Sequence, residues 1–480
     1  MPSEFITPVD PATGGDHEAV AAVSASEVQE QVRRSRLAQY DWRFTPPEER
    51  AEALRRVADA LEAKADEIGT VITSEMGRVR AESVPEVTKS ASFFRYFADI
   101  GPAALAETTL DISGLTLAEK TAVIRYEPRG VVAVLKPWNA PVQQIVWAIA
   151  PALMAGCAVV VKPSEYAPRS ALALQEALDS ALPRDVAATL PGGPETGEAL
   201  VDADVDMVTF TGSIATGRKV AAAAGNRLRK CLLELSGKDA LIVDPAVSNL
   251  DLVAAGIVYG AYSNCGHWCS SIERVLLPSS IAEELTAKVV ALTEGLRVGP
   301  GYTAGVDVGP IANRKQFEIV RSIVDDAVSR GARVLTGGAP LNLPGHENGY
   351  FFAPTVLSDV PLEARLTTEN VFGPVVAIEE YEDVDQAVSR ANDTNYGLGL
   401  SVWTDSAEFA EYVIARSDTG MVWVNEPLQS LAACPWSVTK ESGYGSELGA
   451  SGLREFTYEK VVQSQLAGNS GPRPWYFPYA

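Results

Sequence analysis

GVVAVLKPWNAPVQQIVWAIAPALMAGCAVVVKP, residues 130–163, is the stretch that indicates the fold class. It opens on the β-rich run Gly130–Leu135 and closes on a second such run, Ala158–Val161. Another β-rich run, Ala122–Tyr126, comes just before it, and a helix-like stretch, Ser170–Ser180, comes just after it. Short strands that alternate with helices are typical of a parallel sheet with helical crossovers. The sequence therefore predicts an α/β fold.

A second alternating block begins after Gly237. Its strand candidates are Ala240–Val243, Arg274–Leu277, Arg333–Leu335, Val375–Tyr381 and Gly420–Asn425. A chain of 480 residues is long for one core and favours two or three domains. We therefore expect two α/β domains that meet near Leu235–Lys238.

The region before these blocks is predicted to be helical. The segment TPPE (45–48) has the order of a capping box, with Thr45 as the cap and proline at the first helical position. Apolar residues then recur near helical spacing, at Ala51, Leu54, Val57, Leu61 and Ile68.

The composition excludes several classes of partner. With 40 basic and 62 acidic residues the net charge is −22, which would repel a phosphate backbone, so we expect no nucleic acid. The apolar run 142–161 is broken by Pro151 and Gly156, so no membrane span is expected. The N-terminus, MPSEFITPVD, lacks the basic and apolar regions of a signal peptide, which favours a cytoplasmic location.

The cysteines are odd in number, five, and contain no C-x-x-C pair, which argues against a disulfide framework and against structural zinc. Cys265 and Cys269 lie four residues apart, but the chain has only three histidines and none is spaced to complete a metal site. No metal is expected.

Cys269 is the candidate nucleophile. It lies in NCGHWCSS (264–271), a glycine-containing loop just past the apolar, helix-like run Leu250–Tyr262. A cysteine attacks as its thiolate, and an unperturbed thiol has a pKa near ~8.5, so backbone N–H groups or a bound cation must help. The alternative is an ordinary buried cysteine, because free cysteine is among the most buried residue types.

Two further motifs precede this loop, PWNAP (137–141) and ELSGK (234–238). With these three motifs in this order, the chain resembles the aldehyde dehydrogenase superfamily, whose members carry P-W-N-x-P, E-L-G-G-K and G-Q-x-C. The resemblance continues through KPSE (162–165), FTGS (210–213), FGP (372–374) and NYGL (395–398), so it covers nearly the whole chain.

The resemblance implies two Rossmann-like parallel-sheet domains, one for the cofactor and one for catalysis, plus a small β oligomerisation domain. It places the NAD-binding domain at 1–109 and 129–235 and the catalytic domain at 236–457. Residues 110–128 and 458–480 are then bridging segments, and a homodimer or homotetramer is expected.

The resemblance also assigns a reaction, the oxidation of an aldehyde to a carboxylic acid. Cys269 would form a thiohemiacetal and then a thioester. Asn139 would stabilise the negative oxygen together with the backbone N–H of Cys269, although as a bare pattern it is equally a turn residue between two prolines. Glu234 would act as the base for thioester hydrolysis, although a glutamate at a strand end is more often solvated. Relatives that transfer the acyl group to coenzyme A usually lack this glutamate.

The cofactor is expected to be NAD. A carboxylate just after a strand, Glu165 beside Lys162, accepts hydrogen bonds from the adenosine ribose and would repel the 2′-phosphate of NADP. Gly212 and Ser213 lie where a strand gives way to a helix, which suits a pyrophosphate. The resemblance adds further cofactor residues, namely Trp138, Ser164, Gly193, Leu235, Asn370 and Phe372.

Three positions depart from the family pattern. Asn370 stands where the family has a glutamate that holds the nicotinamide ribose, which predicts looser nicotinamide positioning, and Ser236 replaces a glycine. His267 replaces a glutamine; we interpret it as a loop-packing residue, although it could lend the thiolate positive charge below neutral pH.

By the same resemblance, the substrate would meet side chains that flank the motifs, namely Ala140, Gln144, Trp147, Trp268 and Ser270. None of these segments supplies an arginine for a carboxylated substrate, though one could come from elsewhere. Two alternatives stay open: a catalytically silent NAD-binding homologue, suggested by Asn370 and His267, and acyl transfer to coenzyme A.

Overall fold

The computed structural model describes residues 4–113, 120–427 and 429–465. The chain opens on a two-stranded ribbon, β1 (Phe5–Ile6) with β2 (Val20–Ala21), and four helices follow it. These helices are α1 (Ala25–Trp42), α2 (Pro47–Ala63), α3 (Ala65–Met76) and α4 (Arg80–Ala104). The predicted helical spacing is confirmed, because all five apolar residues that defined it are buried.

The predicted capping box at residues 45–48 is wrong. Helix α2 begins at Pro47 and its cap position is Pro46, which has no side chain that can accept a backbone N–H. A capping box forms instead at the start of α1, between Ser24 and Glu27. The helix begins one residue later than predicted. Two prolines follow each other here, and the sequence pattern does not show which of them occupies the first helical position.

The first parallel sheet has six strands in the order β20-β9-β8-β5-β6-β7, and only β20 runs antiparallel. Its strands are β5 (Val131–Leu135), β6 (Ala158–Lys162), β7 (Ala187–Thr189), β8 (Met207–Thr211), β9 (Lys230–Glu234) and β20 (Gly443–Tyr444). Side chains alternate between two cores. One core packs against α2, α3, α4, α5 (Gln143–Ala155) and α6 (Pro168–Asp179), and the other against α1, α7 (Pro194–Asp202) and α8 (Ile214–Gly225).

The second sheet has seven strands in the order β12-β13-β14-β11-β10-β16-β17, and all pairs except β12–β13 are parallel. Its strands are β10 (Ala240–Val243), β11 (Arg274–Pro278), β12 (Arg333–Thr336), β13 (Thr355–Ser358), β14 (Val375–Tyr381), β16 (Gly399–Trp403) and β17 (Met421–Val424). The helices of this unit are α9 (Leu250–Tyr262), α10 (Ala282–Glu294), α11 (Arg314–Ser329), α12 (Arg365–Thr368), α13 (Val384–Asn392) and α14 (Ala407–Ile414). The predicted α/β class with two parallel-sheet units is therefore confirmed.

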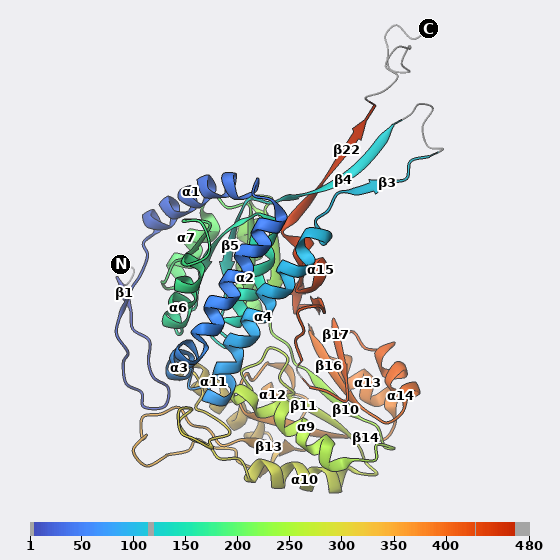
Figure 1. The fold of residues 1–480 in the computed structure, drawn as a ribbon. Helices are drawn as coiled ribbons and strands as arrows, with labels where there is room; N and C mark the ends of the chain where they lie inside the picture. Colours follow the sequence, from blue (N-terminus) through green and yellow to red (C-terminus); the bar gives the residue numbers. More distant parts are fainter. Residues whose placement is uncertain (1–3, 114–119, 428, 466–480) are drawn as a thin grey trace.

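A third sheet projects from the body of the molecule (Figure 1). It consists of β22 (Thr457–Ser464), β4 (Thr121–Pro128) and β3 (Thr108–Leu110), all antiparallel. The predicted strand Ala122–Tyr126 exists, but it lies in this sheet and not in the first parallel one. Parts of the predicted bridging segments, residues 114–119 and 466–480, lie outside the described residues.

Short elements near the C-terminal end connect the two parallel-sheet units. Small pairs form between β15 (Tyr396–Gly397) and β19 (Thr439–Lys440), and between β18 (Trp436–Ser437) and β21 (Ser446–Glu447). Strand β20 joins β9, and α15 (Gly449–Glu455) packs on α4 and α5. Residues 443–455 therefore pack against the first unit, although they follow the second unit in sequence. The predicted domain bounds stay a prediction.

Candidate active site

The loop that carries Cys269 leaves α9 through a tight turn, η1 (Ser263–Gly266), and continues to β11. Three successive residues, Asn264, Cys265 and Gly266, have positive φ angles of 51°, 55° and 72°. At Gly266 a side chain is excluded, because a Cβ atom would lie 2.2 Å from the carbonyl oxygen of Gly373. The FGP segment is therefore packed directly against the turn that leads into the loop of Cys269.

Cys269 is part-buried and lies close to two carboxyl groups. Burial raises the pKa of its thiol to about 12, and the carboxyl groups of Asp239 and Glu234 raise it further, while the backbone N–H groups of Ser270 and Cys269 oppose the rise. Without substrate or cofactor, the sulfur is therefore a protonated thiol at neutral pH. A proton acceptor is needed before it can attack.

Glu234 is the last residue of β9, and its side chain is buried. Neither carboxyl oxygen has a hydrogen-bond partner among the described residues. Burial raises its pKa well above the ordinary value, the carboxyl group of Glu447 raises it further, and the ammonium of Lys136 lowers it. A buried carboxyl without a partner is costly to a fold, and such groups gather at functional sites.

An ion pair that the sequence does not indicate lies beside Glu234. Lys136, just after β5, and Glu447, on β21, form a fully buried pair, and the Lys136 ammonium also donates to the hydroxyl of Thr211 at 2.7 Å. No local signal marks either residue, because lysines and glutamates next to short strands are usually solvated. The pair could be found only from the fold, since its members are 311 positions apart.

Asn139 is brought to the cysteine loop. Its side-chain amide donates to the carbonyl oxygen of His267 at 2.9 Å, and the side chain of Asn264 donates to the Asn139 carbonyl oxygen at 2.8 Å. The amide has a second N–H, which this bond leaves available for another acceptor. The structure therefore brings Cys269, Glu234 and Asn139 together, from three separate segments of the chain.

His267 is a buried, neutral side chain. Burial lowers its pKa to about 3, with a further lowering by the Arg78 guanidinium, and its Nε2 has no partner among the described residues. Its ring packs edge-on against Trp138, with the centroids 4.9 Å apart, and lies 5.9 Å from the ring of Phe372. The suggestion that His267 carries positive charge just below neutral pH is therefore wrong, and it is a packing residue.

Asn370 is tied to the ELSGK motif, because its amide donates to the carbonyl oxygen of Gly237. The next two backbone N–H groups, at Val371 and Phe372, donate to the carboxylate of Glu273 at 2.9 to 3.1 Å. Glu273 in turn pairs with the fully buried Lys238. The FGP segment and the ELSGK motif thus form one connected polar network beneath the cysteine loop.

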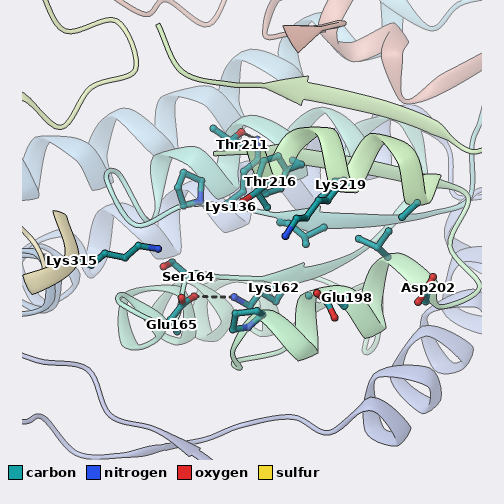
Figure 2. A pocket seen from close by; sticks show the side chains of 18 residues that line it. Lys136, Lys162, Ser164, Glu165, Glu198, Asp202, Thr211, Thr216, Lys219 and Lys315 are labelled. Atoms are coloured by element: carbon teal, nitrogen blue, oxygen red, sulfur yellow. Dashed lines mark hydrogen bonds and ion pairs between the residues drawn. The ribbon is translucent and has the colours of Figure 1, made fainter. Parts of the chain in front are cut away.

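A cavity of 580 Å³ lies at the carboxyl ends of β5, β6 and β8, the edge where parallel sheets bind ligands (Figure 2). Three of the predicted cofactor residues line it, namely Lys162, Ser164 and Glu165. The other seven do not appear in its wall, namely Trp138, Gly193, Gly212, Ser213, Leu235, Asn370 and Phe372. Two of these lie next to the wall as helix caps: Gly193 precedes α7, and the Ser213 hydroxyl accepts the Thr216 N–H at the start of α8.

A dinucleotide fits the residues that line this cavity. The N-terminal turn of α7 and that of α8 both face it, through Gly197 and Thr216, and helix N-termini are suited to anionic groups. Lys162 pairs with Glu165 at 3.2 Å on its floor, so both a cation and a ribose-binding carboxylate are present.

The predicted substrate residues are mostly buried. Ala140, Gln144, Trp147 and Ser270 are enclosed, and the Gln144 Oε1 and Trp147 Nε1 atoms on α5 have no partner among the described residues. Trp268 is part-exposed, and its Nε1 donates to the Ser263 hydroxyl at 3.1 Å. Two unpartnered polar atoms one helical turn apart suit a substrate with a polar group.

An arginine does reach this region from elsewhere in the chain. The Arg78 guanidinium lies 4.9 Å from the ring centroid of Trp268, just before Cys269. It is already paired with Glu82 and Glu86, so its charge is neutralised inside the protein. This arginine orders the loop and is not an open site for a carboxylated substrate.

Within residues 4–113, 120–427 and 429–465 no three His, Cys, Asp or Glu side chains are grouped so that they could hold a metal ion. None of the helices described in these ranges is both long enough and apolar enough to cross a membrane.

Comparison with known proteins identifies the family. A model of the aldehyde dehydrogenase family matches residues 2–462. The chain is 36% identical over 442 residues to the peroxisomal aminoaldehyde dehydrogenase 1 of Pisum sativum, which covers 91% of this chain and 86% of that protein. It is 36% identical over 466 residues to a putative NADP(+) succinate-semialdehyde dehydrogenase 2 of Mycobacterium ulcerans, with 96% and 88% covered.

Solved structures agree with this result. The fold superimposes with a TM-score of 0.93 on betaine aldehyde dehydrogenase from Staphylococcus aureus in complex with NAD+, at 28% identity, covering 98% of this chain and 94% of that one. The chain therefore belongs to the aldehyde dehydrogenase family. Aldehyde oxidation with a nicotinamide dinucleotide is the general reaction of that family.

Proposed function

We propose that this protein oxidises an aldehyde to a free carboxylic acid with NAD, through a thioester on Cys269. The observation that carries the proposal is the Glu234 carboxyl, which is buried, lacks any partner among the described residues and raises the pKa of the Cys269 thiol. A carboxyl held in this way is suited to accept protons in turn from the thiol and from a water molecule.

In the first half of the reaction, the Cys269 thiol gives its proton to the Glu234 carboxylate, which releases it to solvent before the second half, and the sulfur adds to the aldehyde carbon. The carbonyl oxygen becomes negative, and the free N–H of the Asn139 amide and the backbone N–H of Cys269 stabilise it. NAD, when bound, would supply the acceptor for the hydride that leaves the former aldehyde carbon as this adduct collapses. The product of this half is a thioester on Cys269.

In the second half, Glu234 removes a proton from a water molecule that attacks the thioester carbon. The carbon–sulfur bond then breaks, the acid leaves and the Cys269 thiol is restored. Because Glu234 is present, hydrolysis is favoured over acyl transfer to coenzyme A. Burial and the Glu447 carboxyl keep the Glu234 pKa raised, the Lys136 ammonium opposes the rise, and a raised pKa suits a base that must also release its proton.

NAD is the proposed cofactor because the Glu165 carboxylate stands in the cavity where an adenosine ribose would lie. The test is a panel of aldehydes supplied with NAD or NADP, with reduced cofactor measured by absorbance. The names of relatives make aminoaldehydes, betaine aldehyde and succinate semialdehyde the first members of the panel. Turnover with NAD in the absence of coenzyme A is expected, and failure with every aldehyde would favour a catalytically silent homologue.

We also propose that the protein is a homodimer or homotetramer. The projecting sheet ends in β22, an edge strand of eight residues whose Tyr458 and Val461 side chains are exposed. Long edge strands with exposed apolar residues are suited to pair with another chain. Light scattering of the purified protein should therefore give a mass of at least twice 51.1 kDa, and a mass of one chain would refute this assembly.

A further inference from the structure

Lys89, in α4, is a half-buried lysine whose charge is not compensated inside the protein. It makes no hydrogen bond or ion pair with any residue that the structure describes. The two glutamates that precede it on the same helix, Glu82 and Glu86, pair with Arg78 instead. A lysine that is partly removed from water without a partner is available for an anionic group of a ligand.

The electrostatic surroundings of Lys89 favour such an anion. Burial lowers the pKa of its ammonium, and the guanidinium of Arg78 lowers that pKa further. No carboxylate among the described residues opposes these two effects. A ligand that brings a negative charge would offset both of them, so it should bind here more tightly than an uncharged ligand of the same shape.

Helix α4 places Lys89 beside the substrate residues that were predicted from sequence. Glu86, three positions earlier, accepts two backbone N–H groups at the start of α5. Phe93, four positions later, packs edge-on against Trp147 of α5, with the ring centroids 5.9 Å apart. Residues three and four positions apart share one face of a helix, so Lys89 lies on the face of α4 that meets α5.

A second donor for an anion is present on α5. Trp147 Nε1 is enclosed and has no acceptor among the described residues. Arg78, whose charge acts on Lys89, lies against the ring of Trp268 just before Cys269. Lys89 is therefore near both a free N–H group and the loop that carries the nucleophile. A carboxylate has two oxygens, so it can accept from an ammonium and from an indole N–H at once.

We propose that Lys89 selects the substrate by binding a carboxylate at the far end of the aldehyde, with Trp147 Nε1 as the second donor. The substrate class is then a semialdehyde, which carries an aldehyde and a carboxylate on one short chain. The inference rests on the proposed dehydrogenase function and narrows it. Lys89 determines specificity, since it binds the substrate away from the reacting carbon.

The same charge works against cationic aldehydes. A substrate that carries an ammonium group would bring a second positive charge to Lys89, and repulsion of this kind is a common means of rejecting the wrong ligand. Betaine aldehyde, which has a quaternary ammonium group, is therefore expected to be a poor substrate of this protein.

The test measures kcat and KM of the full-length protein, with saturating NAD, for two matched pairs of aldehydes. Succinate semialdehyde is paired with butanal, and glutarate semialdehyde with pentanal. In at least one pair the carboxylated member should have the higher kcat/KM by about tenfold or more, the usual effect of a charge-assisted hydrogen bond. Lys89→Ala should lower this preference about tenfold, and the loss should lie in KM, because the carboxylate is remote from the reacting carbon.

Two further variants control the comparison. Lys288→Ala removes the same charge from α10, where this lysine pairs with Asp251 at 2.7 Å on the surface, and it should leave the preference unchanged. Lys89→Glu reverses the charge at the proposed site, so it should lower the preference further and raise kcat/KM for betaine aldehyde. Melting temperatures show whether each variant is folded.

Two results would overturn the inference. One is an unmodified protein that oxidises butanal and pentanal at least as well as their carboxylated counterparts, which would leave the proposed function intact. The other is a preference that persists in both Lys89 variants, or that falls equally in Lys288→Ala. If the unmodified protein oxidises no aldehyde at all, the proposed function fails together with this inference.

Discussion

Asn139 holds the cysteine loop in place, and the proposed reaction gives the same side chain a chemical role. One N–H of its amide holds the His267 carbonyl two residues before the nucleophile, and the other is free for the substrate oxygen. A hydrogen bond that forms only when the oxygen becomes negative lowers the barrier to reaction.

Asn139→Ala should therefore lower kcat by about 10²- to 10³-fold, the usual effect of removing one such donor. Steady-state kinetics with a good aldehyde from the panel would measure it. The NAD dissociation constant and the melting temperature serve as controls, since a general loss of structure would change both. A kcat within threefold of the unmodified protein would contradict the assigned role.

His267 is expected to reduce stability in acid. Its pKa is lowered from 6.5 to about 3 in the folded protein, so the unfolded chain binds a proton there that the folded protein does not. Stability is therefore complete above pH 6.5 and is lost as the pH falls from 6.5 toward 3.

His267→Gln removes this group and should flatten the acid side of the stability profile. Between pH 7 and pH 5 the unmodified protein should lose about 2 kcal/mol more free energy of unfolding than the variant. Urea unfolding of both proteins at the two pH values gives the comparison. Equal losses would show that His267 titrates normally and is not enclosed.

At the scale of elements, buried polar residues join segments that are distant in sequence. Glu273, just before β11, accepts the backbone N–H groups of Val371 and Phe372 at the start of the FGP segment, and it pairs with Lys238 just before β10. The side chain of Lys238 is 0% exposed and that of Glu273 is 1% exposed. Removing one partner would leave the other charge enclosed and unpaired.

Glu273→Ala should lower the free energy of unfolding by about 3 kcal/mol. The control is Glu176→Ala, which breaks a surface pair with Lys64 and should not change the midpoint of urea unfolding measurably. If the two variants behave alike, the buried network does not hold the FGP segment in place.

Elements could be predicted from sequence where local composition is strong. Strand β5 lies within the predicted run because an uninterrupted set of buried apolar residues is bounded by Gly130 and Pro137. Strands β13 and β16 were missed, and in β16 the residues Gly399 and Ser401 interrupt the apolar pattern. The local pattern alone does not indicate which sheet receives β4, because its partner β22 begins at Thr457, far along the chain; only the family resemblance put the two segments together.

Some residues of the candidate site could also be predicted from sequence, and others could not. The motifs predicted Cys269, Glu234 and Asn139, and the structure brings these three together. The raised pKa of Glu234 was predicted from the apolar run that it ends. The Lys136–Glu447 pair and the pKa shifts of Cys269 and His267 could not be predicted, because burial is created by contacts between distant segments. The charge of His267 was misjudged for that reason, as its enclosure depends on Trp138 and Phe372 from two other loops.

At the scale of the whole molecule, the active site lies where the two sheet units meet. The first unit supplies Glu234 at the end of β9, and the second supplies the cysteine loop before β11. Strand β20 returns from the second unit and pairs Gly443 with Glu234, and β21 then places Glu447 beside Lys136. The C-terminal part of the chain thus encloses the carboxyl that the proposed chemistry uses.

In the proposed reaction, Cys269 carries an acyl group that Glu234 helps water to remove. In Glu234→Gln, oxidation to the thioester should proceed while hydrolysis slows by about 10²- to 10⁴-fold. Rapid mixing of this variant with NAD and an aldehyde should give a burst of one reduced cofactor per chain, and mass spectrometry should find the acyl group on the peptide that contains Cys269. A variant that forms reduced cofactor without a burst, or that carries its adduct on another cysteine, would contradict the account.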